Sequence, residues 1–193
     1  MQRKSYAFVG LILMMVLLGG AMSAQAEAFR DTIDLYKKSP VVEPFFKSAY
    51  GYAVFPTIGK GGFVVGGAYG KGRVYHDGKV TGEASLIKVS VGFQAGGQAF
   101  SEMIFFEDKR AYEEFTSGEF EFDAAASAVA ITAGVQAKAG TEGASASATA
   151  GPATGTQAKT GYYKGMVVFT HAKGGLMYEA AIGGQKFKFT PKE

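Results

Sequence analysis

The spacing of apolar residues changes twice along the chain. Residues 6–18 form an unbroken apolar stretch, residues 28–38 carry apolar side chains at helical spacing, and from Tyr50 onward apolar and polar residues alternate. A period of two is typical of half-buried strands, whereas spacings of three and four are typical of amphipathic helices. We therefore expect an apolar leader, short helices and then a long β-rich region.

The helical region is expected to contain two short helices. In Ala28–Lys38, Phe29 and Tyr36 fall on one side. Ser39 and Pro40 are expected to end this helix and to start a second one, with Ser39 as its cap and Pro40 at its first position. The second helix would carry Val41, Phe45, Phe46 and Lys47. Two interpretations stay open: the helices pack on the core, or they form an apolar and basic edge that enters a bilayer surface.

The alternating region predicts a series of short strands. Asp77 and Gly78 are a strong signal for a two-residue hairpin turn, and His76 is expected to be an exposed neighbour of that turn. Glycine doublets within apolar strands are typical of bends or of close backbone approach. The expected strands are Tyr52–Phe55, Gly62–Tyr69, Gly72–His76, Lys79–Glu83, Leu86–Phe93, Phe100–Phe106, Gly165–Thr170, Leu176–Ala181 and Lys186–Thr190.

One further helix is expected after these first strands. Asp108 is a suitable N-terminal cap and Gly118 a suitable stop. Tyr112 and Phe115 would then face inward. The acidic residues around them are expected to form a solvated helix face.

The remaining segments complete the predicted fold. Residues 119–123 alternate charge with phenylalanine, residues 124–139 are Ala-rich but alternate as a strand does, and residues 140–161 are a low-complexity loop of Ala, Gly, Ser and Thr. The fold class predicted is α+β: a Gly-rich, curved antiparallel β-sheet or barrel-like core with two or three short flanking helices.

The N-terminus has the order of a secretory signal. Arg3 and Lys4 precede the apolar stretch, and Ala24-Gln25-Ala26 follows it as a small-residue cleavage site. We expect residues 1–26 to be a cleaved signal and residues 27–193 to be a single domain. The protein would then be exported to the periplasm or cell envelope of a Gram-negative bacterium, or secreted. An uncleaved anchor over residues 6–22 is the alternative.

Composition excludes several kinds of chemistry. The 193 residues contain no Cys, which excludes disulfides, thiolate nucleophiles and Cys-ligated metals. His76 and His171 are the two histidines; His171 is expected at the surface, and neither has a nucleophile–carboxylate partner pattern. The run Gly59–Arg73 is Gly-rich, but its spacing matches neither a P-loop nor a dinucleotide fingerprint. We therefore expect a non-enzymatic protein with no cofactor and no metal.

Charge argues against nucleic acid as a partner. The net charge of +3 falls to +1 when Arg3 and Lys4 are removed with the signal, and phosphate backbones require a concentrated basic surface. The charge is nevertheless uneven. Arg30–Lys88 holds nine basic and five acidic residues, whereas Glu102–Asp123 holds eight acidic and two basic ones.

Two blocks of the sequence resemble the SYLF domain family. The first is Tyr50-Gly-Tyr-Ala-Val-Phe-Pro-Thr-Ile-Gly-Lys-Gly-Gly-Phe-Val-Val-Gly-Gly-Ala-Tyr-Gly-Lys-Gly, and the second runs from Val91 to Phe106; Phe120–Gly134 and Gly165–Gly184 resemble weaker later blocks. The resemblance implies a lipid-binding module. Eukaryotic members bind phosphoinositides and bundle actin, partly through an N-terminal amphipathic helix. An exported bacterial member meets neither partner, so actin binding is not expected here.

The expected function is therefore the binding of anionic phospholipid at a membrane surface. Lysine and arginine near an anionic surface each contribute about 1 kcal/mol, and aromatic side chains suit the interface. Two alternatives stay open: a soluble envelope module that binds another protein, and a small outer-membrane β-barrel. The candidate lipid-binding residues are Lys37, Lys38, Phe45, Phe46, Lys47, Lys60, Lys71 and Arg73.

Overall fold

A computed structural model describes residues 24–63, 65–122, 129–130 and 161–193. Within them, no helix is both long and apolar enough to cross a membrane. Residues 24–37 are helical and are called the N-terminal helix here. The elements after it are α2 (Glu43–Ser48), β1 (Gly51–Gly62), β2 (Val65–His76), β3 (Lys79–Phe106), α3 (Lys109–Thr116), β4 (Glu119–Phe122), β5 (Val129–Ala130) and β6 (Met166–Pro191).

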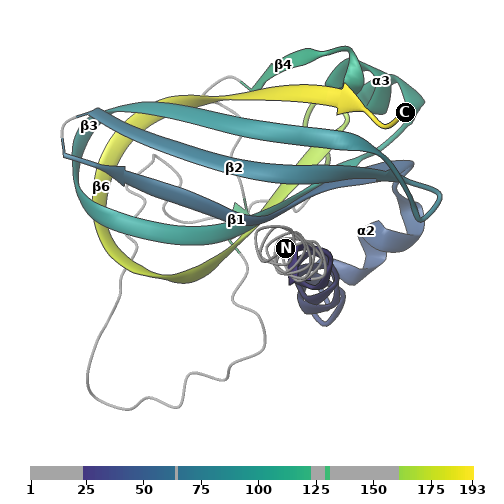
Figure 1. The fold of residues 1–193 in the computed structure, drawn as a ribbon, viewed down its shortest axis with the longest axis horizontal. Helices are drawn as coiled ribbons and strands as arrows, with labels where there is room; N and C mark the ends of the chain where they lie inside the picture. Colours follow the sequence, from purple (N-terminus) through teal and green to yellow (C-terminus); the bar gives the residue numbers. More distant parts are fainter. Residues whose placement is uncertain (1–23, 64, 123–128, 131–160) are drawn as a thin grey trace, which may run out of the picture.

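The strands form one sheet in the order β1-β2-β3-β6-β4, and β5 pairs with β6. All pairings are antiparallel except that between β5 and β6. The first half of β3 pairs with β2 and its second half pairs with β1, while β6 follows β3 along its length. The two long strands therefore curve around the β1–β2 hairpin (Figure 1). The fold is broadly α+β, with the sheet dominating.

Two forms of the core were predicted, a curved antiparallel sheet and a barrel-like one. The antiparallel sheet is confirmed, and the barrel-like form is wrong because the sheet is not closed into a barrel. The predicted division into many short strands is also wrong. Lys79–Glu83, Leu86–Phe93 and Phe100–Phe106 are parts of one strand, β3, and the last three predicted strands all lie in β6. Glycine doublets caused the error, since here they bend a strand without ending it: Gly96 adopts a φ of 120° inside β3.

The concave side of the sheet, called the inner face, carries the larger core. Glycines on β2 let side chains of β1 come close: a Cβ at Gly72 would lie 2.6 Å from the Phe55 ring, and one at Gly70 would lie 2.5 Å from Ile58 Cγ1. Helix α3 adds Phe115 to this core. Its buried members are Ala53, Phe55, Ile58, Ala68, Val74, Ala84, Leu86, Ile104, Phe106, Ala111, Phe115, Met166, Val168 and Phe187.

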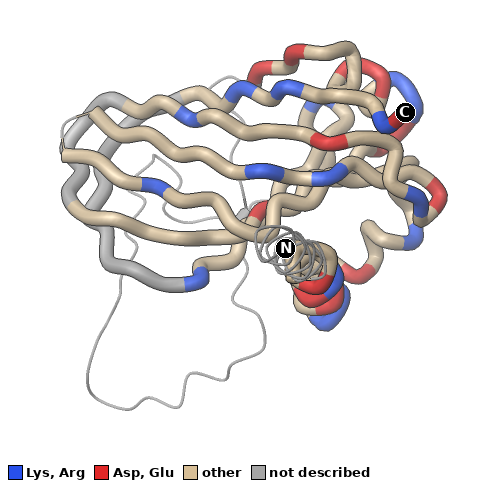
Figure 2. The backbone as a smooth tube through the Cα atoms, in the orientation of Figure 1, with Lys and Arg blue, Asp and Glu red and all other residues tan. Residues whose placement is uncertain are grey.

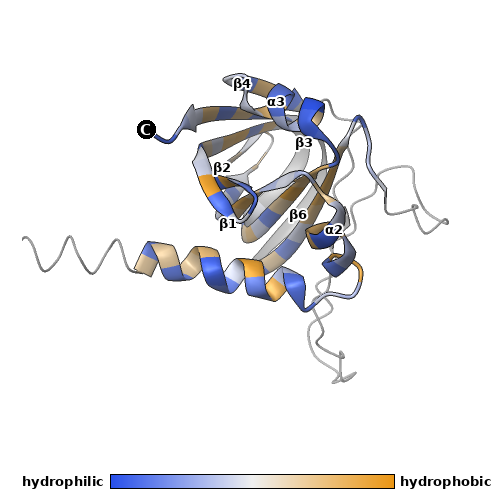
Figure 3. Cartoon of the chain, turned by 90° about the vertical axis from the view of Figure 1, so that its right-hand side faces the viewer, coloured by the Kyte–Doolittle hydropathy of each residue, from blue (hydrophilic) through white to orange (hydrophobic). Residues whose placement is uncertain are grey.

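The opposite side, called the outer face, carries a second core at one end. Figure 3 shows the N-terminal helix outside the curve of the sheet, below β1 and near α2. The helices cover side chains that alternate with those of the inner core, as the strand period requires. The buried members of this second core are Phe29, Tyr36, Val42, Val54, Tyr75, Met103, Phe105, Val167 and Phe169.

The local predictions for turns and helices have mixed outcomes. The hairpin at Asp77-Gly78 is confirmed, with φ values of 49° and 72°. The helix after Asp108 is confirmed as α3, whose first turn donates from Ala111 N to Asp108 Oδ1 at 2.8 Å. The predicted start at Ser39-Pro40 is wrong, because α2 begins at Glu43 and Ser39 is buried in the turn that precedes it. The predicted loop 140–161 lies outside the described residues, except at its last residue.

Candidate functional site

The aromatic candidates of α2 lie in the second core. The Phe45 ring is 5.2 Å from that of Phe169 and 5.7 Å from that of Phe105. The Phe46 ring is 4.9 Å from that of Phe105, nearly perpendicular to it. Both side chains are half-buried. They pack against the sheet, as the first of the two helix interpretations expects.

Tyr36 fastens the N-terminal helix to both long strands. Its hydroxyl donates to the Ser101 carbonyl at 2.9 Å and lies 3.2 Å from the Phe169 carbonyl. The side chain is fully buried, and burial raises the pKa of Tyr36 above its ordinary value. The phenol therefore stays neutral and keeps its proton for these bonds.

The lysines near these helices remain at the surface. Lys37, Lys38 and Lys47 are exposed. Lys47 Nζ lies 2.6 Å from Glu43 Oε1, and Lys37 Nζ lies 5.6 Å from the centre of the Phe46 ring. The Lys37 ammonium group therefore lies over the ring of Phe46 in α2. The apolar side chains of the two helices nevertheless face the protein.

The candidates on the hairpin do not form one group. Arg73 stacks over the Phe29 ring at 4.4 Å and is half-buried on the outer face. Lys71 is exposed on the same face. Lys60 pairs with Ala68 and alternates with Ile58, both inner-face positions, so it lies on the inner face. The structure therefore separates Lys60 from Lys71 and Arg73.

A small pocket lies where the N-terminal helix crosses the outer face. Its volume is about 130 Å³, and its lining includes Gln25, Phe29, Lys71, Glu83, Ser85, Lys188 and Thr190. Lys71 pairs with Ser85 across β2 and β3, and Ser85 pairs with Lys188 across β3 and β6. Two cations therefore flank one hydroxyl on a single row of the sheet, and Glu119 of β4 pairs with Lys188 at the end of that row.

Sequence reasoning missed Ser85 and Lys188. Alternation places both on outward positions, but only the register between β3 and β6 brings Lys188 level with Lys71. A second hollow shares Lys71 and Phe29 with the first and is lined by Tyr69. The predicted cleavage after Ala26 would remove Gln25 from both and open them further.

A buried carboxyl of the described interior was not singled out by the sequence. Glu102 is fully buried on the inner face. Burial raises the pKa of its carboxyl from 4.5 to about 7, although Lys88 and the amide of Gln185 favour the ionised form. Gln185 Nε2 lies 3.5 Å from Oε2. Among the described atoms, Oε1 has no hydrogen-bond partner.

Both histidines differ from the surface positions expected for them. His76 is half-buried, stacks on Tyr50 at 4.2 Å, and its Nδ1 lies 2.8 Å from the Tyr50 carbonyl oxygen. His171 is also half-buried, and its Nδ1 lies at a buried position. His76 is less exposed than expected because the ring of Tyr50, just before β1, stacks on it and covers it. Within the described chain, no three His, Asp or Glu side chains are grouped as metal ligands.

Comparisons with known proteins give no match: no family model, no curated protein and no solved structure matches the chain.

Proposed function

We propose that this chain is an exported, non-catalytic protein of the SYLF type that binds anionic phospholipid at a membrane surface. The observation that carries the proposal is the row Lys71–Ser85–Lys188 at the edge of the outer-face pocket. Two ammonium groups and a hydroxyl offer the donors that a phosphate group requires. Tyr69 lines the adjoining hollow and supplies an amphipathic ring beside them.

Electrostatic attraction sets the size of the expected effect. Each lysine near an anionic membrane contributes about 1 kcal/mol, and the contribution decays within a Debye length. Reversing two lysines exchanges attraction for repulsion, so affinity should fall by roughly tenfold or more. Binding should also weaken as salt is added.

Co-sedimentation with vesicles tests the proposal. The processed chain should bind phosphatidylcholine vesicles that contain phosphatidylglycerol and should not bind vesicles of phosphatidylcholine alone. Lys71→Glu with Lys188→Glu should weaken binding most, and Lys37→Glu with Lys38→Glu should weaken it less. Lys109→Glu, an exposed change on α3, is the matched control and should leave binding unchanged.

Binding that ignores both lipid charge and these reversals would overturn the proposal. Capture of a specific envelope protein by a chain that leaves vesicles untouched would instead support the protein-binding alternative.

A further inference from the structure

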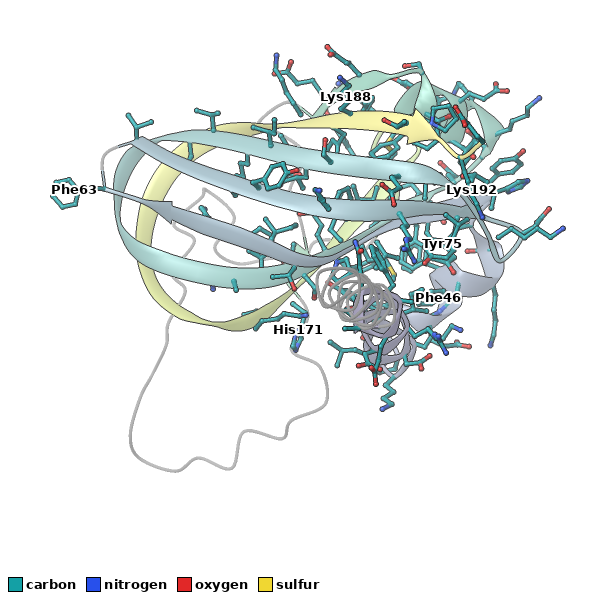
Figure 4. All side chains as sticks on the ribbon, viewed as in Figure 1. Phe46, Phe63, Tyr75, His171, Lys188 and Lys192 are labelled. Atoms are coloured by element: carbon teal, nitrogen blue, oxygen red, sulfur yellow. The ribbon has the colours of Figure 1, made fainter. Side chains whose placement is uncertain are left out.

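Large apolar side chains are exposed where the β1–β2 hairpin ends. Phe63 is 70% exposed in the turn between the two strands, and Figure 4 shows it pointing away from the rest of the molecule. Four more exposed apolar residues lie on the adjoining outer face: Val65, Tyr69, Ile87 and Val89. We call these five residues the hairpin end.

The sheet register makes the hairpin end one continuous surface. Tyr69 pairs with Ile87, and Val89 pairs with Gly67, two residues from Val65. Paired positions on one face of an antiparallel sheet are neighbours about 5 Å apart. Contiguous exposed apolar surface of this kind marks contact sites with proteins or membranes.

Glycines make these side chains stand out. Gly61 and Gly67 pair with each other beside the patch, and both are exposed. A Cβ at Gly67 would meet only a backbone oxygen at 3.9 Å. Packing therefore does not require glycine at these positions. Because Gly61 and Gly67 carry no side chains, they leave the rings of Phe63 and Tyr69 accessible.

The charge around the hairpin end favours an anionic partner. Residues 57–72, 84–98 and 172–189 build this half of the sheet, and together they hold six lysines and one glutamate. β4 adds two glutamates at its edge: Glu119 pairs with Lys188, and Glu121 lies 3.2 Å from Lys186. Lysines still outnumber glutamates by six to three. Residues 102–123, which include α3 and β4, hold eight acidic and two basic residues. Figure 2 shows the acidic residues gathered mainly on the helices and β4, toward the right of the view, whereas the turn between β1 and β2 lies at the left.

We propose that the hairpin end is the part of the molecule that enters an anionic bilayer. Phe63 and the outer-face residues Val65, Tyr69, Ile87 and Val89 lie in the boundary between headgroups and acyl chains. The outer-face lysines Lys71 and Lys188 contact the headgroups, and α3 with its acidic residues points away from the membrane. The inference rests on the proposed lipid-binding function and assigns its contact surface and orientation.

Tryptophan fluorescence tests the orientation directly, because the chain contains no Trp. Phe63→Trp and Tyr163→Trp each create a single reporter at an exposed aromatic position. On phosphatidylcholine vesicles containing phosphatidylglycerol, the reporter at position 63 should shift its emission to the blue and be quenched by brominated acyl chains. The reporter at position 163 should do neither.

Affinity provides the second measurement. Burying a phenylalanine side chain changes a partition constant by roughly tenfold to a hundredfold, so Phe63→Ser should weaken vesicle binding by that factor. Tyr163→Ser and Val41→Ser, at side chains that are each 46% exposed, are matched controls and should leave it unchanged. Thermal unfolding should match the wild type in all three variants, since these side chains are solvated.

The outcomes separate the two proposals. If the wild type binds anionic vesicles but both reporters behave alike and Phe63→Ser binds normally, the hairpin-end inference is wrong and the lipid-binding proposal stands. If the wild type ignores anionic vesicles, both proposals fail. If Phe63→Ser lowers the mass of a self-associated form in light scattering while vesicle binding is unaffected, the hairpin end is a contact between copies of this chain, and the inference is overturned.

Discussion

The buried carboxyl of Glu102 should make the stability of this protein fall as pH rises from 4.5 to about 7. Its pKa is raised from 4.5 to about 7, chiefly because burial disfavours the charged form. Below pH 4.5 the carboxyl is protonated in both the folded and the unfolded chain. Between 4.5 and about 7 only the folded chain holds the proton, so its stabilising contribution is progressively lost as pH increases.

The size of the effect follows from the same two values. A tenfold change in an acid constant is worth about 1.4 kcal/mol, so the change from 4.5 to about 7 corresponds to about 3 kcal/mol. Glu102→Gln replaces the carboxyl with a neutral group of similar shape. The difference in free energy of unfolding, Glu102→Gln minus wild type, should therefore rise by up to about 3 kcal/mol between pH 4.5 and about pH 8.5.

Urea denaturation across this pH range measures the difference between the two proteins. Comparing the variant with the wild type at each pH cancels the titration of groups that both share. Glu83→Gln, an exposed change on the outer face of the same strand, is the control, and surface changes of this kind stay within about 0.5 kcal/mol. A constant difference between Glu102→Gln and the wild type from acid to base would refute the reasoning.

Other features of the fold make shorter predictions. Gly72→Ala forces a methyl group against a buried ring and should lower the free energy of unfolding by about 1–3 kcal/mol, whereas Gly59→Ala, whose Cβ would have no neighbour within 4 Å, should leave it unchanged or raise it; chemical denaturation compares the two. Tyr36→Phe removes the bond to Ser101 and should cost about 1 kcal/mol, with faster hydrogen exchange in the N-terminal helix as the measurement. Asp108→Ala removes the cap of α3 and should lower the thermal midpoint by an amount that corresponds to about 1 kcal/mol.

Patterning predicted the kinds of element better than their lengths. The alternation from Tyr50, the turn at Asp77-Gly78 and the cap at Asp108 each depend on neighbours in sequence, and each is present in the structure. The continuity of β3 and β6 depends on pairing between them over their full length. Because of that pairing, each strand continues through glycines that, from the local sequence alone, were expected to end a strand.

The candidate site was predicted only where local sequence determined it. Lys71 and Arg73 were named as candidates together with Lys60, but only the structure shows that the first two share the outer face while Lys60 lies on the inner one. Ser85 joins Lys71 through the register of β2 and β3, and Lys188 joins Ser85 through the register of β3 and β6, between residues more than a hundred positions apart. Phe63 lay inside a block read for its glycines, and its exposure follows from its place in the turn between β1 and β2.

The two possible membrane-contact regions differ in what binding requires of the fold. Contact through the N-terminal helix and α2 requires that their apolar side chains leave the second core, where Phe29, Tyr36 and Val42 are buried. Exposing three such side chains costs roughly 5 kcal/mol or more, and the Tyr36 hydrogen bonds would break as well. Phe63 and its neighbours are already exposed. The hairpin end can therefore enter a bilayer without a rearrangement of the fold. Contact through the helices can be as favourable only if their lipid contacts first offset the cost of exposing the second core.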